Sequence, residues 1–98
     1  MILVLGSVAI QKGKITQALA VSQEHVMRSR TEPGCIAHAV HQDCENPNRL
    51  VFIEEWEDQA SLQRHFKVSE SGAFVKALAA MAVEPPSMAI YEATQVRV

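Results

Sequence analysis

The side chains best suited to chemistry include a carboxylate and an indole on one extended run in the middle of the chain. Glu54 and Trp56 stand two residues apart in that run, so they should share one face of a strand with Phe52. A carboxylate on an apolar face must be paired, hydrogen-bonded or protonated. Glu54 could orient a reacting group, or be a rim carboxylate bonded to tryptophan, arginine or backbone. Trp56 is the only tryptophan, a residue type that often anchors a core or an interface.

Two histidines are candidates for acid–base work. His65 follows Leu62 by three residues on a predicted short helix, so it could line a cleft between helix and sheet. Imidazole titrates near neutral pH and suits a general base, although a purely structural histidine fits the same pattern. His38 falls on a predicted strand, on the face that we assign to Ile36 and Val40, and is the second candidate for the cleft.

The other two histidines are predicted to lie elsewhere. His41 points to the opposite face of its strand, and His25 lies off the apolar stripe of the first predicted helix. That stripe consists of Ile15, Ala18, Leu19, Ser22 and Val26. We therefore expect no histidine cluster that could bind a metal, and Cys35 and Cys44 lack the spacing of a zinc site. The chain also has no phosphate-binding glycine loop and no nucleophile elbow.

Alternating strands and helices must position these residues. We expect strands over residues 2–10, 35–43, 50–56 and 88–98, where extended patterns prevail. A helix of about four turns should begin near Ile15 and end at Glu32-Pro33-Gly34, because proline and glycine stop helices. Asp58 could cap a short second helix. A third helix should end before Pro85-Pro86 and carry Phe74, Leu78, Met81 and Ala82.

The order of these elements, β-α-β-β-α(α)-β, defines the expected fold. It predicts an α+β protein with the ferredoxin-like split β-α-β arrangement, a four-stranded antiparallel sheet with its helices on one face. All 98 residues should form one domain, residues 1–98.

The predicted sheet is apolar on both faces. In the first strand, one face carries Ile2, Val4, Val8 and Ile10, and the other carries Leu3, Leu5 and Ala9. Val51 and Ile53 continue the second face on the third strand. Helices can cover only one face, and monomers rarely leave a large apolar patch in water. We therefore expect a homodimer in which two copies pack sheet to sheet.

Composition and charge exclude several classes of partner. The 9 basic residues do not cluster, since Arg28-Ser29-Arg30 is followed by Glu32, so we expect solvated charges there and no nucleic-acid partner. No run approaches the roughly 20 apolar residues of a membrane span, and no basic segment precedes the apolar N-terminus. We therefore expect no membrane partner, and a cytoplasmic location with both thiols free.

Three short motifs lie in and around the predicted hairpin. Glu32-Pro33-Gly34-Cys35 fits an E-x-G-C turn, and the strand that ends at Glu54-Glu55-Trp56 fits an E-x-W ending. The segment from Asp58 through Leu62 to His65 is similar to a helix of the A-L-x-x-H type. In this order and spacing, the motifs resemble the antibiotic biosynthesis monooxygenase family over residues 32–66, and the element order resembles it over the whole chain.

The resemblance implies a function. Members of this family of dimeric α/β-barrel proteins are dimers of ferredoxin-like subunits, and several oxidise quinols, anthrones or related phenolics with dioxygen and without metal or flavin. By resemblance, His65 is the base or a hydrogen-bond partner of the substrate hydroxyl, Trp56 walls the cavity, and Glu54 orients a neighbour. The small aromatic substrate would contact Glu54, His38, Phe52, Phe74 and Met81.

The chain departs from the family at three places. Many members have tyrosine where this chain has His38, and many have a further histidine where this chain reads Ser69-Glu70-Ser71-Gly72. Haem-degrading relatives use an asparagine on the first strand, which is absent here, so haem degradation is not expected. Two alternatives stay open, because one fold hosts many activities: an isomerase or degradation enzyme for a small carbonyl metabolite, and a non-catalytic dimeric ligand-binding module.

Overall fold

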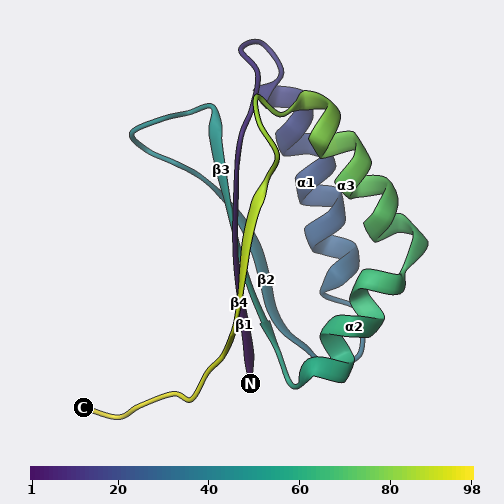
Figure 1. Cartoon of the computed structure of the whole chain (residues 1–98), viewed down its shortest axis with the longest axis vertical. Helices are drawn as coiled ribbons and strands as arrows, with labels where there is room; N and C mark the ends of the chain where they lie inside the picture. Colours follow the sequence, from purple (N-terminus) through teal and green to yellow (C-terminus); the bar gives the residue numbers. More distant parts are fainter.

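A computed structural model describes residues 1–98 as four strands and three helices (Figure 1). In chain order the elements are β1 (Ile2–Ala9), α1 (Ile15–Ser29), β2 (Cys35–Gln42), β3 (Arg49–Trp56), α2 (Gln59–Lys67), α3 (Ser69–Met81) and β4 (Ser87–Glu92). The order agrees with the prediction. None of the three helices has the length and apolar character needed to cross a membrane.

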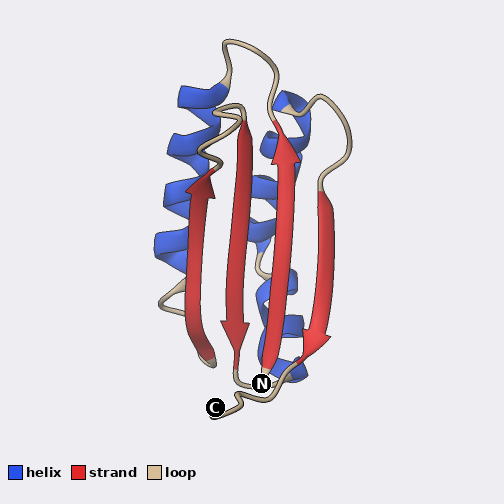
Figure 2. Cartoon of the chain, turned by 90° about the vertical axis from the view of Figure 1, so that its left-hand side faces the viewer, coloured by secondary structure: helices blue, strands red, loops and turns tan.

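The strands form one antiparallel sheet in the order β2-β3-β1-β4. All three helices pack on the same face, and Figure 2 shows the opposite face with no element in front of it. This is the ferredoxin-like arrangement predicted from the sequence. The two central strands, β1 and β3, bring Val4 opposite Glu54 and Ile2 opposite Trp56, so the predicted polar residues lie at the middle of the sheet and towards its end.

The last strand is shorter than predicted. We expected it to run to Val98, but β4 ends at Glu92. Its only neighbour is β1, in which Ile2 pairs with Glu92, and the last backbone hydrogen bonds between the two segments join Met1 and Ala93. The first strand also ends one residue early, since Ile10 bridges to Ala82 instead of continuing the sheet.

The helices begin and end where local chemistry requires. Gly13 has a positive φ of 86° and turns the chain before α1. The Asp58 side chain accepts a hydrogen bond from the backbone N–H of Ser61 at 2.8 Å and so caps α2, as predicted.

The inner face of the sheet holds the apolar core in two clusters. The larger cluster lies between α1, α3 and the sheet and contains Val8, Ile10, Ala18, Leu50, Phe52, Leu78 and Met81. The smaller cluster lies towards the other end of the central strands, under α2, and contains Ile2, Val4, Trp56 and Leu62.

The outer face of the sheet is apolar and uncovered. Leu5 pairs with Ile53 across the two central strands, and these side chains are 40% and 37% exposed. Tyr91 on β4 pairs with Leu3 and extends the same face. The alternation read from the first and third strands is therefore confirmed: one apolar set is buried under helices and the other faces outward.

A tight turn joins the end of α1 to β2 and fixes the start of α2. Gly34 has a φ of 84°, a conformation that disfavours residues with a Cβ atom. A Cβ atom at this position would also overlap the side chain of Ser61, which is 2% exposed. The glycine therefore allows the first turn of α2 to approach the turn that carries Glu32, and His65 lies one helical turn after Ser61.

Two glycine substitutions test this close approach. Gly13 has nearly the same φ as Gly34, but a Cβ atom there would meet nothing within 4 Å. Gly13→Ala should therefore lower the free energy of unfolding by about 1–2 kcal/mol, because alanine is strained at a positive φ. Gly34→Ala should lower it by at least about 1 kcal/mol more, because its Cβ atom also overlaps Ser61. Urea unfolding of both variants measures the difference. Equal losses of unfolding free energy would show that the Ser61 contact does not constrain the turn.

Candidate active site

Polar side chains gather on the inner face between the two apolar clusters. Eight polar residues are buried: Ser22, His25, Ser29, His38, Glu54, Ser61, His65 and Ser71. Three of these are histidines from three different elements, α1, β2 and α2. Buried polar groups need partners, so the contacts of this group define what it can do.

Glu54 is the charged centre of the group. Its Oε1 atom accepts a 2.9 Å hydrogen bond from the indole N–H of Trp56 and lies 3.3 Å from Nε2 of His38 and 4.0 Å from Nε2 of His65. Burial raises the pKa of the Glu54 carboxyl, but the nearby His38 and the Trp56 hydrogen bond outweigh it, so the pKa is below its ordinary value. Glu54 is therefore a buried carboxylate: the alternative of a rim position is wrong, but the bond to tryptophan that it included is confirmed.

His65 is oriented by a second carboxylate. Its Nδ1 atom lies 2.8 Å from Oε1 of Glu32, while Oε2 of Glu32 accepts a 3.0 Å hydrogen bond from Arg28. Because a carboxylate only accepts, Nδ1 of His65 donates, and in the neutral ring the Nε2 lone pair is free. Glu32 belongs to the E-x-G-C turn, so that motif supplies the acceptor that fixes the tautomer of the histidine.

His25 is part of the site, and its predicted place off the buried stripe is wrong. The buried positions of α1 are Ala18, Ser22, His25, Val26 and Ser29. The spacing 18, 22, 25, 29 is helical, so the signal was present; it was missed because only apolar and small residues defined the stripe. The His25 ring stacks on Phe74 at a centroid distance of 4.0 Å and an interplanar angle of 6°.

Arg28 fixes the proton of His25 on Nε2, whereas the proton of His65 is on Nδ1. Its Nη2 atom lies 2.7 Å from Nδ1 of His25, and since a guanidinium can only donate, Nδ1 accepts and Nε2 carries the proton. Burial, with His38, His65 and Arg28 nearby, lowers the pKa of His25 to about 3, so the ring is neutral at physiological pH.

The basic segment at the end of α1 is solvated only in part. Arg28 is partly buried and also donates to Ser71 of α3 at 3.3 Å. Ser29 is fully buried and donates to the carbonyl oxygen of His25. Arg30 is exposed, and its Nε donates to the carbonyl oxygen of His38 at 2.9 Å. The prediction of solvated charges is therefore wrong for Arg28 but not for Arg30.

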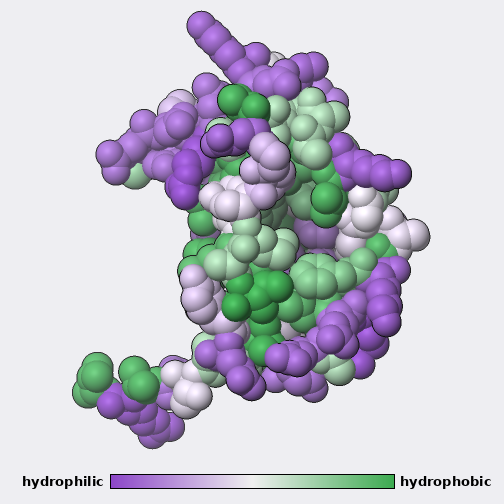
Figure 3. Space-filling view, viewed as in Figure 1, coloured by the Kyte–Doolittle hydropathy of each residue, from purple (hydrophilic) through white to green (hydrophobic).

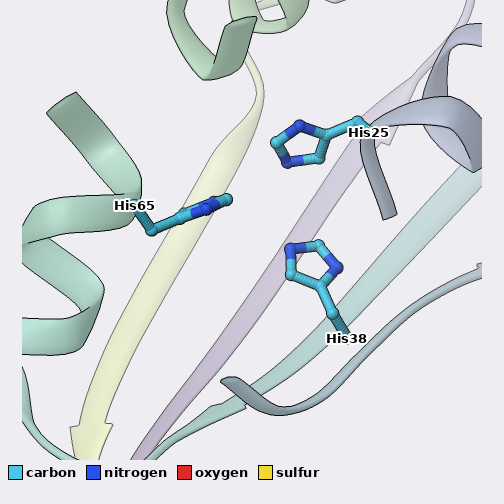
Figure 4. Close-up of side chains that lie close together, drawn as sticks. All are labelled: His25, His38 and His65. Carbon is cyan, nitrogen blue, oxygen red and sulfur yellow. The ribbon is translucent and has the colours of Figure 1, made fainter. Parts of the chain in front are cut away.

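The three buried histidines surround one point, as Figure 4 shows. The ring centroids of His25 and His38 are 5.3 Å apart, those of His25 and His65 are 5.3 Å apart, and those of His38 and His65 are 5.6 Å apart. One nitrogen of each ring lies within 4.8 Å of the others. The expectation that the histidines form no cluster is wrong for these three. His41, paired with Val51, lies on the opposite face, as predicted, and is exposed.

His38 reaches this cluster through an irregularity of β2. The register with β3 shifts between Cys35 and Ala37, so His38 pairs with Glu54 on the inner face while Ile36 is 52% exposed. The prediction that Ile36 shares the face of His38 is therefore wrong, because a bulge reverses the alternation. His38 itself is 2% exposed.

A cavity of about 520 Å³ adjoins the cluster between the sheet and the helices. Figure 3 shows the hollow, bordered by hydrophobic residues. Four of the predicted site residues line it: Phe52, Glu54, His65 and Phe74. Its volume is in the range of small-molecule sites, and most of its surface is apolar.

The other predicted site residues lie outside this lining. Trp56 is fully buried in the smaller core cluster and does not wall the cavity. Its indole donates a hydrogen bond to Glu54, which does line the cavity. Met81 belongs to the larger core cluster, and His38 lies beneath the cavity floor against Glu54. Residues that sequence reasoning missed include His25, Phe66, Ser71 and Lys76.

The family follows from comparison with known proteins. Residues 1–77 match the model of the antibiotic biosynthesis monooxygenase family. The chain belongs to this family. It is also 31% identical over 91 residues to the uncharacterized protein sll1783 of Synechocystis, with 93% of this chain aligned, and it spans 62% of the length of that relative.

Solved structures agree on the fold. A crystal structure of an antibiotic biosynthesis monooxygenase superposes with a TM-score of 0.90 at 28% identity, covering 97% of this chain and 100% of the other. A conserved protein from Methanosarcina mazei superposes with a TM-score of 0.90 at 25% identity, covering 95% of this chain and 92% of the other. Rv0793 from Mycobacterium tuberculosis has a TM-score of 0.90 at 12% identity, covering 99% of this chain and 98% of the other, which is a similarity of fold alone.

The bond between Trp56 and Glu54 can be tested by a double-mutant cycle. Trp56→Phe removes the indole N–H that satisfies the buried carboxylate, and the bond should contribute about 1.5–3 kcal/mol because its acceptor is charged. The same substitution in a Glu54→Leu background has no carboxylate to leave unsatisfied and should cost correspondingly less. Urea unfolding of the four proteins gives the coupling energy. A coupling near zero would contradict the role assigned to the indole.

Proposed function

We propose that the chain is a monooxygenase that oxidises a small aromatic substrate, a quinol or an anthrone, with dioxygen and without metal or flavin. The observation that carries this proposal is the His65–Glu32 pair at the wall of an apolar cavity. The Glu32 carboxylate accepts a hydrogen bond from Nδ1 of His65, with a distance of 2.8 Å between Nδ1 and Oε1. Nε2 of His65 is therefore an oriented base at the cavity.

The first step is proton transfer. A phenol hydroxyl of a quinol, or the CH₂ group of an anthrone in its keto form, loses a proton to Nε2 of His65. The positive charge that develops on the ring is stabilised by the Glu32 carboxylate and by Glu54, whose Oε1 atom is 4.0 Å from Nε2. His25, held with its Nε2–H as a donor, is placed to bind the anionic oxygen of the substrate.

The second step is oxidation by dioxygen. The electron-rich anion transfers an electron to dioxygen, and recombination forms a carbon–oxygen bond. Loss of water then leaves a carbonyl, so that one oxygen atom enters the substrate and the other leaves as water. The substrate supplies all four electrons, so no further reductant is required. The apolar walls, among them Phe52, Phe74 and Leu78, keep water from the reactive anion.

Removal of the base tests the proposed function. His65→Ala should lower dioxygen uptake with a panel of quinols and anthrones by about 10²–10⁴-fold, the usual contribution of a positioned base. His41→Ala, at an exposed histidine outside the cluster, is the matched control and should retain full activity. An oxygen electrode measures both. Unchanged uptake in His65→Ala would refute the assignment, and substrate binding without any uptake in the unmodified protein would favour a ligand-binding module.

The outer face of the sheet is the proposed dimer interface. Leu5, Ile53 and Tyr91 leave an apolar surface on the face that no helix covers (Figure 2). We propose that a second copy packs on it sheet to sheet, since this buries both patches about a two-fold axis. The helix-covered face would then hold one cavity in each subunit, independent of the interface.

A charge on this face should separate the subunits. Ile53→Lys places an ammonium group at the centre of the proposed interface, where it would lose its hydration, so the protein should sediment as a monomer. Met27→Lys adds the same charge at a 66% exposed position of α1 and should leave the dimer intact. Analytical ultracentrifugation distinguishes the two. A monomeric unmodified protein, or a dimeric Ile53→Lys, would contradict the proposed interface.

A further inference from the structure

The triangle of buried histidines has the dimensions of a metal site. Imidazoles that bind one metal through nitrogens at about 2.1 Å in tetrahedral geometry have ring centroids roughly 5 Å apart. The centroids of His25, His38 and His65 are separated by 5.3, 5.3 and 5.6 Å. Their nearest nitrogens, within 4.8 Å of one another, are further apart than ligands of one metal, but rotation of the rings can bring them together while the backbones stay in place.

His38 is the member that the proposed oxygenation leaves unexplained. Both of its ring nitrogens are buried without a hydrogen bond, because the 3.3 Å approach to Glu54 lies outside hydrogen-bonding geometry. A buried imidazole with no partner at either nitrogen is costly. Coordination of one nitrogen to a cation would satisfy it.

His65 already has the outer partner that metal-bound histidines usually have. Such histidines donate the second ring N–H to a carboxylate or a carbonyl, which orients the ring and raises its basicity. Nδ1 of His65 donates to Glu32, and Nε2 faces the same Glu54 oxygen as Nε2 of His38. Glu54 therefore lies where it could supply both a fourth ligand and a compensating negative charge.

We propose that His25, His38 and His65 bind a divalent transition metal, with Glu54 as the fourth ligand and an open position towards the cavity. Three imidazole ligands suit Zn²⁺, Fe²⁺, Cu²⁺ and Ni²⁺, whereas the hard cations Ca²⁺ and Mg²⁺ take oxygen ligands. His25, Glu54 and His65 all line the cavity, so a small molecule there can reach the ion.

Arg28 must move when the metal binds. It now donates to Nδ1 of His25, which keeps the proton on Nε2, whereas a metal at Nε2 requires the proton on Nδ1. Arg28 also donates to Glu32 and Ser71, so these two acceptors can hold the guanidinium when it releases His25. Arg28 therefore competes with the metal for His25, by its hydrogen bond and by its charge.

Metal binding and the proposed proton transfer exclude each other in one subunit, since both use the Nε2 lone pair of His65. The two proposals can fail separately. Metal binding is measured without substrate, and dioxygen uptake is measured on protein freed of metal with a chelator.

Titration with Co²⁺ tests the site directly. The 98-residue protein should bind one Co²⁺ per chain and develop the visible absorption of a tetrahedral ion, and Zn²⁺ should displace it. X-ray absorption of the Zn²⁺-loaded protein should show several imidazole nitrogens at about 2.0–2.1 Å, a result that needs no variant. Absence of stoichiometric binding, or a spectrum without imidazole ligands, would overturn the proposal.

Variants then identify the ligands. His38→Ala should abolish the tetrahedral spectrum, and His41→Ala, outside the cluster, should leave it unchanged; circular dichroism checks that both are folded. Glu32→Gln should weaken binding by about 10–100-fold through His65. Arg28→Gln, which removes the competing charge and offers an acceptor to His25, should strengthen binding. Binding that survives His38→Ala, or weakens in Arg28→Gln, would overturn the proposed ligand set.

Discussion

The structure depends on the burial of one carboxylate on the inner face of the central strand β3. An ionised Glu54 in an apolar core would be too costly without partners. The Trp56 indole on the same strand donates a hydrogen bond to it at 2.9 Å, and the imidazoles of His38 on β2 and His65 on α2 lie 3.3 and 4.0 Å from the same oxygen. Three elements therefore meet around this carboxylate, beside the cavity.

The surrounding network gives two neighbouring histidines different roles. Glu32 accepts from Nδ1 of His65, and Arg28 donates to Nδ1 of His25, so one ring presents a lone pair and the other presents a proton. Arg28 and Glu32 are themselves paired at 3.0 Å, which couples the two rings. The close approach of Gly34 and Ser61 sets the distance between Glu32 and α2. A turn motif and a helix motif that are separate in sequence thus act as one unit.

The sequence predicted what depends on periodicity and failed where the pattern is broken or mixed. The two-residue spacing of Glu54 and Trp56 placed both on the inner face, and the same alternation identified the apolar outer face. The bulge in β2 could not be read from the residues and misplaced Ile36. His25 was missed because only apolar and small residues were taken to define the buried stripe of α1, although its spacing from Ala18, Ser22 and Ser29 is helical. Tertiary packing alone places Trp56 and Met81 outside the cavity.

The assignment of opposite tautomers to His65 and His25 is the centre of this account, and long-range ¹H–¹⁵N NMR of the imidazole rings measures it directly. In metal-free protein at neutral pH, Nδ1 of His65 should be protonated, while His25 should be neutral with its proton on Nε2. The same neutral tautomer in both rings, or a positively charged His25 at neutral pH, would contradict the account.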